Sequence, residues 1–545
     1  MSSTFGILES ARSGLNAAQL GLNITSQNIS NANTDGYTRQ ALNISAKSPD
    51  TGAYRFPDSN QKVGQGVSVD SVYQIRDSFL DVRYRYENSS YNLYNSMNSL
   101  MSPIEDKFNE VGATTTTKNK LIGLSGMIDN IITSLQKGQN TPTDTSISED
   151  VKDDLDLLTS TIRNDSKSLK DALDSAKKEL SIYVNGGVGD TSDGDISGGI
   201  NGMIVDIQNL NEEIASYEVT GQKANDLRDQ RNLLLDKLST YMDIDTTEQE
   251  NGMVSVKLAG DSYKNIIDSD NNANVFSIGT DSTSGATVLQ WSASVTPNGT
   301  RTPLPSSDVK TAAVAGGTIK AYLNVINGDA SGTDNPATGQ CGNLGIPYLQ
   351  KKLNEFAVSL VNIMNNTGGV VNGSDVSGTQ FLTYTGYTSS ETTADMLNND
   401  VASTIKITDD WRSDPDKFLT NYTGAEPGSY YTKYVLALNK TTGTVPIPTA
   451  SDGTKVYSGS VRDFADSFTQ EIAAEISSFT NKGDAAKING ENLDSQRQAI
   501  SSVSTNDEGV NIIKYQQAYN ANARVITVID EMLDKLINGT GTTGL

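Results

Sequence analysis

The sequence of 545 residues contains no histidine and a single cysteine, Cys341. Without histidine, the chain lacks the commonest general base, the commonest metal ligand, and the nucleophile systems that depend on either role. One cysteine forms neither an internal disulfide nor a cysteine-based zinc site. We therefore interpret Cys341 as a tolerated thiol, and we expect no catalytic residues, no bound metal and no cofactor.

Long apolar runs and basic charge are scarce as well. No run approaches the ~18 residues that cross a bilayer, so membrane insertion is not expected. Met1–Leu22 lacks the basic start and apolar block of a Sec signal, and these rules alone predict a cytoplasmic location. Lys and Arg number 42 against 66 Asp and Glu, which gives a net charge of −24. Such a surface repels phosphate backbones, so nucleic-acid binding is not expected.

Net charge is absent from the two ends of the chain. Within residues 1–45, Glu9 and Asp35 balance Arg12 and Arg39, and residues 510–545 balance in the same way. The whole negative charge therefore lies in the middle. Neutral ends tolerate close association with other protein, whereas an acidic middle suits exposure to solvent.

Two acidic segments resemble ligand loops without matching them. Asp268–Asn272 begins like a calcium loop, but Ala273 replaces the glycine at the sixth position and Gly279 the glutamate at the twelfth. We interpret this segment as a solvated turn. The glycine-flanked segment 190–195 has no loop pattern, and we interpret it as a flexible linker.

Residues 4–30 show the periodicity of one amphipathic helix. Its other face carries Ser, Asn and Gln rather than charge, which favours packing on further protein. Turn formers predict the end of the helix near Asn31. The helix carries two lines at seven-residue spacing: Leu8, Leu15, Leu22 and Ile29, and the small residues Thr4, Ala11, Ala18 and Thr25.

A second helix is predicted from about residue 505 to 537, with a seven-residue repeat of its own. A single Asn among apolar seam residues, here Asn522, is a device that fixes helix register. Both ends of the chain therefore carry seams for helix pairing. The two lines are Ile512, Tyr519, Ile526 and Leu533, and Tyr515, Asn522, Ile529 and Leu536.

The middle of the chain alternates between helical and strand periods. Helical spacing extends through 77–241, switches to period two at Val254–Leu258 and Leu289–Val295, and returns at 319–363 and 461–479. Short extended segments are predicted at Gln40–Ile44 and Gly66–Val72. A Thr/Gly/Ser-rich region, 371–455, has candidate strands at 405–407 and Tyr431–Leu438. The predicted fold is mainly α with β-rich insertions, an elongated multi-domain chain.

Two segments carry a resemblance to a known family. Ser26–Gln40 (SQNISNANTDGYTRQ) resembles the N-terminal signature of flagellar rod, hook and hook-associated proteins. Tyr515–Ile526 with Asp530–Asp534 resembles their C-terminal signature. In the middle, Ala224–Leu234 and Ile346–Leu353 resemble the hook-associated protein 1 family. The segment before the last helix, 501–509, departs from the family pattern, and this affects only local turn geometry.

The resemblance implies a structural subunit that joins hook to filament and is exported to the extracellular flagellum by the type III apparatus. It implies a domain 0 built from 1–75 and 505–545, a helical core from 76–242, 316–370 and 456–504, and β-rich parts at 243–315 and 371–455. The implied partners are the chain itself, hook protein, the next hook-associated protein and an export chaperone. The expected assembly residues are Leu8, Leu15, Leu22, Ile29, Asn31, Asn33, Gly36, Tyr37, Ile512, Tyr515, Tyr519, Asn522, Ile526, Ile529, Leu533 and Leu536.

Two alternatives stay open at this point. Another axial subunit, such as a hook-like protein, would have a shorter helical core than 77–241. The β insertions could instead carry a surface adhesin or a hydrolase. The absence of histidine and of metal motifs argues against hydrolysis, whereas glycan or host-surface binding stays open. For an assembling subunit, we expect the ends to be largely disordered before assembly, because their seams lack partners.

Overall fold

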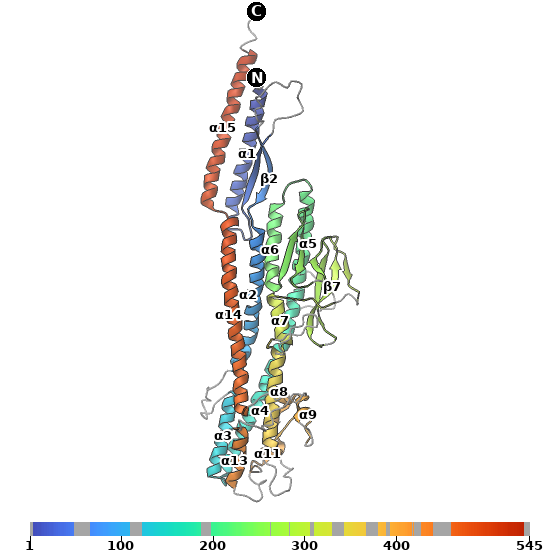
Figure 1. The fold of residues 1–545 in the computed structure, drawn as a ribbon, viewed down its shortest axis with the longest axis vertical. Coiled ribbons are helices and arrows are strands. Elements are labelled where there is room, and N and C mark those ends of the chain that lie inside the picture. The colour runs from blue at the N-terminus through green and yellow to red at the C-terminus, as the bar shows by residue number, and fades with distance from the viewer. Residues whose placement is uncertain are drawn as a thin grey trace, which may run out of the picture.

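The molecule is elongated (Figure 1). A pair of terminal helices lies at one end, a helical shaft in the middle, a β-sheet beside the shaft, and a small lobe at the far end. No helix within the described ranges is long and apolar enough to cross a membrane. The prediction of a mainly α chain with β insertions is confirmed. The computed structural model describes residues 4–47, 66–108, 123–186, 198–261, 263–282, 284–305, 310–329, 343–366, 380–388, 393–416, 418, 427–439 and 459–538.

The terminal segment contains α1 (Thr4–Ser30), β1 (Gln40–Ala46), β2 (Val67–Gln74) and α15 (Thr505–Asn538). The helix predicted for 4–30 and both extended segments are confirmed. α1 ends in successive turns, and Gly36 has a φ of 79°, which favours glycine. β1 and β2 pair antiparallel, with a bulge between Asn43 and Ile44.

The shaft is built on α2 (Ser78–Phe108) and α14 (Val461–Ser501), which run side by side (Figure 1). α14 begins with a capping box, because the Ser460 hydroxyl accepts from the Asp463 amide and the Asp463 carboxylate accepts from the Ser460 amide. α4 (Thr145–Asn185), α7 (Gly317–Asn327) and α8 (Ile346–Asn366) pack on this pair. The core that they share includes Met97, Met101, Leu158, Phe356, Phe464 and Ile472.

A six-stranded antiparallel sheet lies beside the shaft in sequence order. It is covered by α5 (Gly199–Glu218) and connects to α6 (Asn225–Tyr241). In β4 and β7 buried residues alternate with less buried ones, as the period-two pattern predicted. The strands are β3 (Ile244–Glu248), β4 (Val254–Leu258), β5 (Asn265–Ile267), β6 (Ala273–Thr280), β7 (Thr287–Val295) and β8 (Arg301–Pro303).

The far lobe corrects one prediction. The strand expected at Tyr431–Leu438 is wrong, because this segment belongs to the helix α13 (Pro427–Leu438). Its buried side chains Tyr430, Tyr434 and Leu438 recur every four residues, which is a helical spacing. The strand expected at 405–407 is confirmed as β10 (Lys406–Ile407), which pairs with β9 (Leu382–Thr383). The lobe also contains α3 (Leu124–Asn140), α9 (Thr393–Leu397), α10 (Val401–Thr404) and α11 (Asp409–Ser413).

Cys341 and the acidic segment 190–195 lie outside the described residues. The turn predicted at Asp268–Asn272 is confirmed. One carboxylate oxygen of Asp268 accepts from the amides of Asp270 and Asn272, at 3.0 and 2.8 Å. The Asn272 side chain donates to both oxygens of the same carboxylate. The carboxylate is therefore used by its own loop.

Candidate assembly interface

The two terminal helices run antiparallel and approach closely at two glycines of α1. A methyl group at Gly14 would lie 2.7 Å from Asn522, and one at Gly21 would lie 2.6 Å from the ring of Tyr515. Seven residues forward along α1 correspond to seven residues back along α15, so the register is constant between these contacts. Larger side chains at these two positions would force the helices apart.

The predicted seam residues of α1 lie beside this contact and are only half-buried. Leu8, Leu15, Leu22 and Ile29 all keep part of their surface exposed. The line of small residues is the buried one, with Ala11 at 4%, Ala18 at 3% and Thr25 at 2% exposure. Small side chains thus form the tight side of the pair, and the larger ones remain partly available.

The predicted seam residues of α15 are also mostly half-buried. Ile529 is the one apolar residue of α15 that is buried, and Leu536 is 59% exposed. The Asn522 side chain donates to the Ala518 carbonyl at 3.0 Å, so its amide is used within α15. Half-buried seam residues are Ile512, Tyr515, Tyr519, Asn522, Ile526 and Leu533.

A second set of apolar residues of α15 is exposed, and one of them, Leu536, also belongs to a predicted seam line. Two of its residues lie near the start of the helix, and the other four recur at three- and four-residue spacing in its second half, so they share one side of the helix. The stripe consists of Val510, Ile513, Val525, Val528, Met532 and Leu536, each between 40% and 65% exposed. We call these six residues the outer stripe.

At its base the pair is joined by a buried carboxylate, that of Glu508, which is 1% exposed. Its oxygens accept from Arg39 Nε at 2.7 Å and from the Asn28 side chain at 3.3 Å. Asn28 also accepts from the Tyr37 hydroxyl at 2.9 Å and from the Gln40 amide at 3.0 Å. Residues of the N-terminal signature therefore meet the first turn of α15 at one point.

The predicted turn residues differ in how they take part in this joint. Burial, and then the carboxylates of Asp226, Asp229 and Glu508, raise the pKa of Tyr37, so its hydroxyl keeps its proton. The Asn31 side chain bonds the Gln27 carbonyl at 3.1 Å, within α1. Asn33 and Gly36 are exposed, and Gly36 lies near Leu233 of α6.

The N-terminal turn docks on α6 through two aspartates. Asp229 accepts from the Thr38 amide at 3.0 Å and from the Gln74 side chain at 2.7 Å. Asp226 accepts from the Gln40 side chain at 2.9 Å. Burial raises the pKa of Asp229 to about 6, although its hydrogen bonds with Thr38 oppose the shift.

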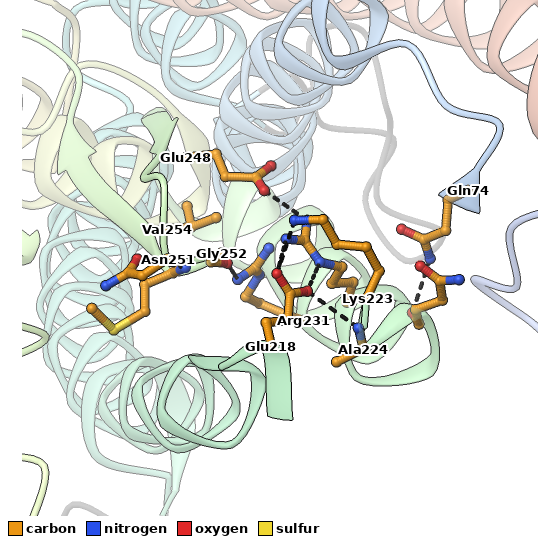
Figure 2. Close-up of polar contacts among 12 residues, drawn as sticks. Gln74, Glu218, Lys223, Ala224, Arg231, Glu248, Asn251, Gly252 and Val254 are labelled. Atoms are coloured by element: carbon orange, nitrogen blue, oxygen red, sulfur yellow. Dashed lines mark hydrogen bonds and ion pairs between the residues drawn. The ribbon is translucent and has the colours of Figure 1, made fainter. Parts of the chain in front are cut away.

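The other side of the same α6 segment holds the end of α5 and the sheet (Figure 2). Arg228 donates to Glu218 at 2.6 Å and to Glu248 at 2.7 Å. Arg231 donates to the carbonyl of Gly252 at 2.7 Å. Burial alone would raise the pKa of Glu218, but hydrogen bonds from Arg228 and Lys223 lower it to about 2.

An ion-pair network lies just below the break between α14 and α15. Arg497 of α14 contacts Asp81 of α2 at 3.0 Å and Asp236 of α6 at 2.7 Å. Asp236 also accepts from Arg85 at 2.6 Å. The network therefore ties α2, α6 and α14 together at the place where the shaft meets the terminal pair.

Periodicity alone did not identify the residues of this joint. Asn28, Arg39, Asp226, Asp229 and Glu508 are polar and lie off the apolar seams. Their position in the sequence could have identified the first four, because these residues fall inside the segments that carry the family resemblance. Glu508 lies in the segment that departs from the family pattern. Among the described residues, no group of three or more His, Cys, Asp or Glu side chains is arranged to hold a metal ion.

Comparisons with known proteins agree with the arrangement. The flagellar hook-associated protein FlgK helical domain matches residues 101–381. The C-terminal domain of flagellar basal body rod FlgEFG proteins matches 495–539, and the flagella basal body rod protein family matches 8–38. These last two ranges contain α15 and most of α1.

Flagellar hook-associated protein 1 of Bacillus subtilis is 30% identical over 550 residues, covering 100% of both chains. Its Salmonella typhimurium counterpart is 27% identical over 46% of this chain and 41% of its own length. A structure of the flagellar hook junction protein FlgK from Burkholderia pseudomallei covers 56% of this chain and 46% of that chain, at 20% identity and a TM-score of 0.39, too low to support an argument. Because one family model spans more than half of the chain and a relative aligns along its whole length, the chain belongs to the flagellar hook-associated protein 1 family, structural proteins of the bacterial flagellum.

Proposed function

We propose that this chain is a non-enzymatic structural subunit of the hook–filament junction, which assembles with copies of itself through its terminal helix pair. The outer stripe of α15 is the observation that carries the proposal. A two-helix pair buries too little apolar surface to be stable alone, and it gains stability when neighbours cover its open face. Copies of the same pair, arranged around an axis, supply such neighbours.

The joint at the base of the pair gives this assembly a defined geometry. The buried Glu508 carboxylate and the Asp226 and Asp229 contacts fix the terminal pair to α6. The Arg497 network fixes α6 to the shaft. A packing force on the terminal helices is therefore passed to the shaft through charge-assisted hydrogen bonds, which are stronger than neutral ones.

Further partners follow from the same surfaces. We propose that hook protein and the next hook-associated protein pack on this subunit from its two axial sides. An export chaperone would cover the outer stripe of α15 before assembly, and the chain would reach the extracellular flagellum through the type III apparatus. The absence of net charge from both terminal segments supports close packing there.

The test uses Val528→Asp in the full-length chain, compared with Gln516→Asp on a polar exposed position of the same helix. We expect Val528→Asp to abolish incorporation into flagella and motility, because a carboxylate in an apolar contact has no partner. The melting temperature of the isolated full-length chain should be similar for the two variants. Normal incorporation of Val528→Asp, or equal loss in both variants, would overturn the proposal.

A further inference from the structure

Away from the terminal helices, one groove among the described residues reverses the charge balance of the chain. A groove of about 720 Å³ lies between the start of α2, the end of β2, α6 and β3. Five basic residues line it against two acidic ones, in a chain with 66 acidic and 42 basic residues. We call it the arginine groove after four of its residues, Arg76, Arg85, Arg228 and Arg231.

Two of these arginines are buried and keep an N–H group unused. Arg85 is 3% exposed and Arg231 is 1% exposed. Arg85 Nη2 and Arg231 Nε have no hydrogen-bond partner among the described residues. Buried N–H groups of arginine are nearly always bonded, so unused ones beside a hollow indicate a missing acceptor.

Arg231 also lacks a carboxylate within ion-pair distance in the described part of the chain. Its guanidinium bonds neutral oxygens, the Asn211 side chain at 3.0 Å and the Gly252 carbonyl at 2.7 Å (Figure 2). Burial and then the nearby Arg228 lower its pKa to about 10. The other arginines of the groove have acidic partners, as Arg76 has Asp81 and Arg85 has Asp236. The uncompensated charge is therefore that of Arg231.

The rim of the groove is apolar and continues along one face of α2. Phe79 is 66% exposed and Val82 38%, and Tyr86 extends the line at helical spacing with 56%. Tyr73 of β2 adds a fourth exposed side chain, at 45%. Aromatic residues beside arginine are the composition of a protein contact, whereas a free inorganic anion has no use for an apolar rim.

We propose that the arginine groove binds a carboxylate side chain presented by a second copy of this chain. The inference rests on the proposed function, because it requires neighbouring copies. Charge complementarity supports this occupant, since each copy carries 66 acidic residues. The groove also adjoins the joint with the terminal pair, so its occupation would be continuous with the contact through α15. An incoming carboxylate would be attracted by the charge of Arg231, which no carboxylate of the described residues balances at ion-pair distance.

The test compares Val82→Glu with the isosteric Val82→Gln in the full-length chain. The introduced carboxylate of Val82→Glu would fill the groove from within and repel the incoming one, whereas Val82→Gln loses the same apolar contact without adding charge. We expect incorporation into flagella to fall about tenfold or more for Val82→Glu and under about threefold for Val82→Gln. The isolated Val82→Glu chain should melt at or above the wild-type temperature.

A third variant, Leu436→Glu, adds the same charge at an exposed apolar position of α13 in the far lobe, and it should incorporate normally. Equal incorporation of Val82→Glu and Val82→Gln would overturn the groove proposal while leaving the proposed function intact. Absence of the wild-type chain from purified flagella would instead overturn the proposed function. Sodium sulfate provides a test for a free oxyanion. If it raises the melting temperature of the wild-type chain but not that of Val82→Glu, and if Val82→Glu still incorporates normally, the groove binds a free oxyanion and the docking proposal is overturned.

Discussion

Two pairs of long antiparallel helices follow each other along the molecule, and they are stabilised in different ways. In the shaft pair, α2 and α14, Met97, Met101 and Phe464 are at most 2% exposed, and further helices cover them. In the terminal pair, α1 and α15, small residues form the contact and the outer stripe stays open. The difference shows that the shaft buries its apolar residues within one chain, whereas the terminal pair leaves many of its own exposed.

Hydrogen exchange on the isolated chain should give the largest difference between the terminal pair and the shaft pair. We expect amides of α1 and α15 to exchange at least about 100-fold faster than those of α2 and α14, because the terminal pair opens without unfolding the shaft. Mass spectrometry of peptides from the four helices measures this. Equal protection in all four would show that the terminal pair is stable alone and would contradict the comparison.

Two side-chain truncations, one in each helix pair, test the same difference in stability. Met101→Ala should lower the free energy of unfolding by about 2–5 kcal/mol, because Met101 is fully buried in the shaft. Val528→Ala should change it by under about 0.5 kcal/mol, since half of that side chain is already exposed. Urea denaturation of both variants gives the values. A larger loss for Val528→Ala than for Met101→Ala would reverse the assignment of the two pairs.

The joint between the two pairs should respond to pH. Burial raises the pKa of Asp229 to about 6, above its usual 3.8, so the folded state holds a proton that the unfolded state has released. This group therefore favours folding at low pH and loses that contribution as pH rises from about 4 through 6, by about 1–2 kcal/mol. The carboxyl of Glu218 has the opposite effect, because its lowered pKa stabilises the folded state above about pH 4.5 and this contribution is lost as pH falls from about 4.5 to 2.

Denaturation curves between pH 4.5 and 7 test the first effect, within a window where Glu218 stays ionised. Asp229→Asn is the matching variant, because it keeps the shape of the side chain and removes the titration. In that variant, the free energy of unfolding should depend less steeply on pH. The dependence will not disappear completely, since burial also raises the pKa of Asp243 to about 6. An unchanged slope would show that Asp229 is not protonated in this joint.

The smallest expected effect concerns the glycines of α1. Gly21→Ala should weaken the terminal pair by about 1 kcal/mol, because the new methyl group would meet the Tyr515 ring. Gly6→Ala is the control, since nothing lies within 4 Å of that position, and it should favour the helix by about 0.5–1 kcal/mol. Competition between each variant and wild type for incorporation into flagella gives the difference. The same sign for both variants would contradict the close contact at Gly21.

Periodicity predicted the helices well, because their apolar residues follow one face over many turns. The expected helices 4–30 and 505–537 match Thr4–Ser30 and Thr505–Asn538. It failed at Tyr431–Leu438, where a short apolar run is compatible with either a strand or a helix. Packing on α3, where Tyr431 lies against Gly138, decides the outcome, and no local pattern reports such a contact.

The candidate site was predicted only in part for a related reason. Seven-residue spacing identified which helix faces are apolar, but not that Gly14 and Gly21 set the distance between the helices. The burial of Glu508 depends on Arg39 and Asn28, which lie more than 460 residues away in sequence. Its sequence neighbours are polar and give no indication that this carboxylate is enclosed. The role of the predicted residues in contacts between subunits stays a prediction.

The separation between Glu508 and Arg39 has a consequence for the order in which the molecule matures. The joint requires residues from both ends of the chain, so it cannot close while either end is still missing. A chain that leaves a narrow channel one residue at a time would therefore have its shaft available before its terminal helices are positioned. For such a chain, the contacts of Glu508 with Arg39 and Asn28 could form only after residue 508 had emerged, so the orientation of the terminal pair would be set late.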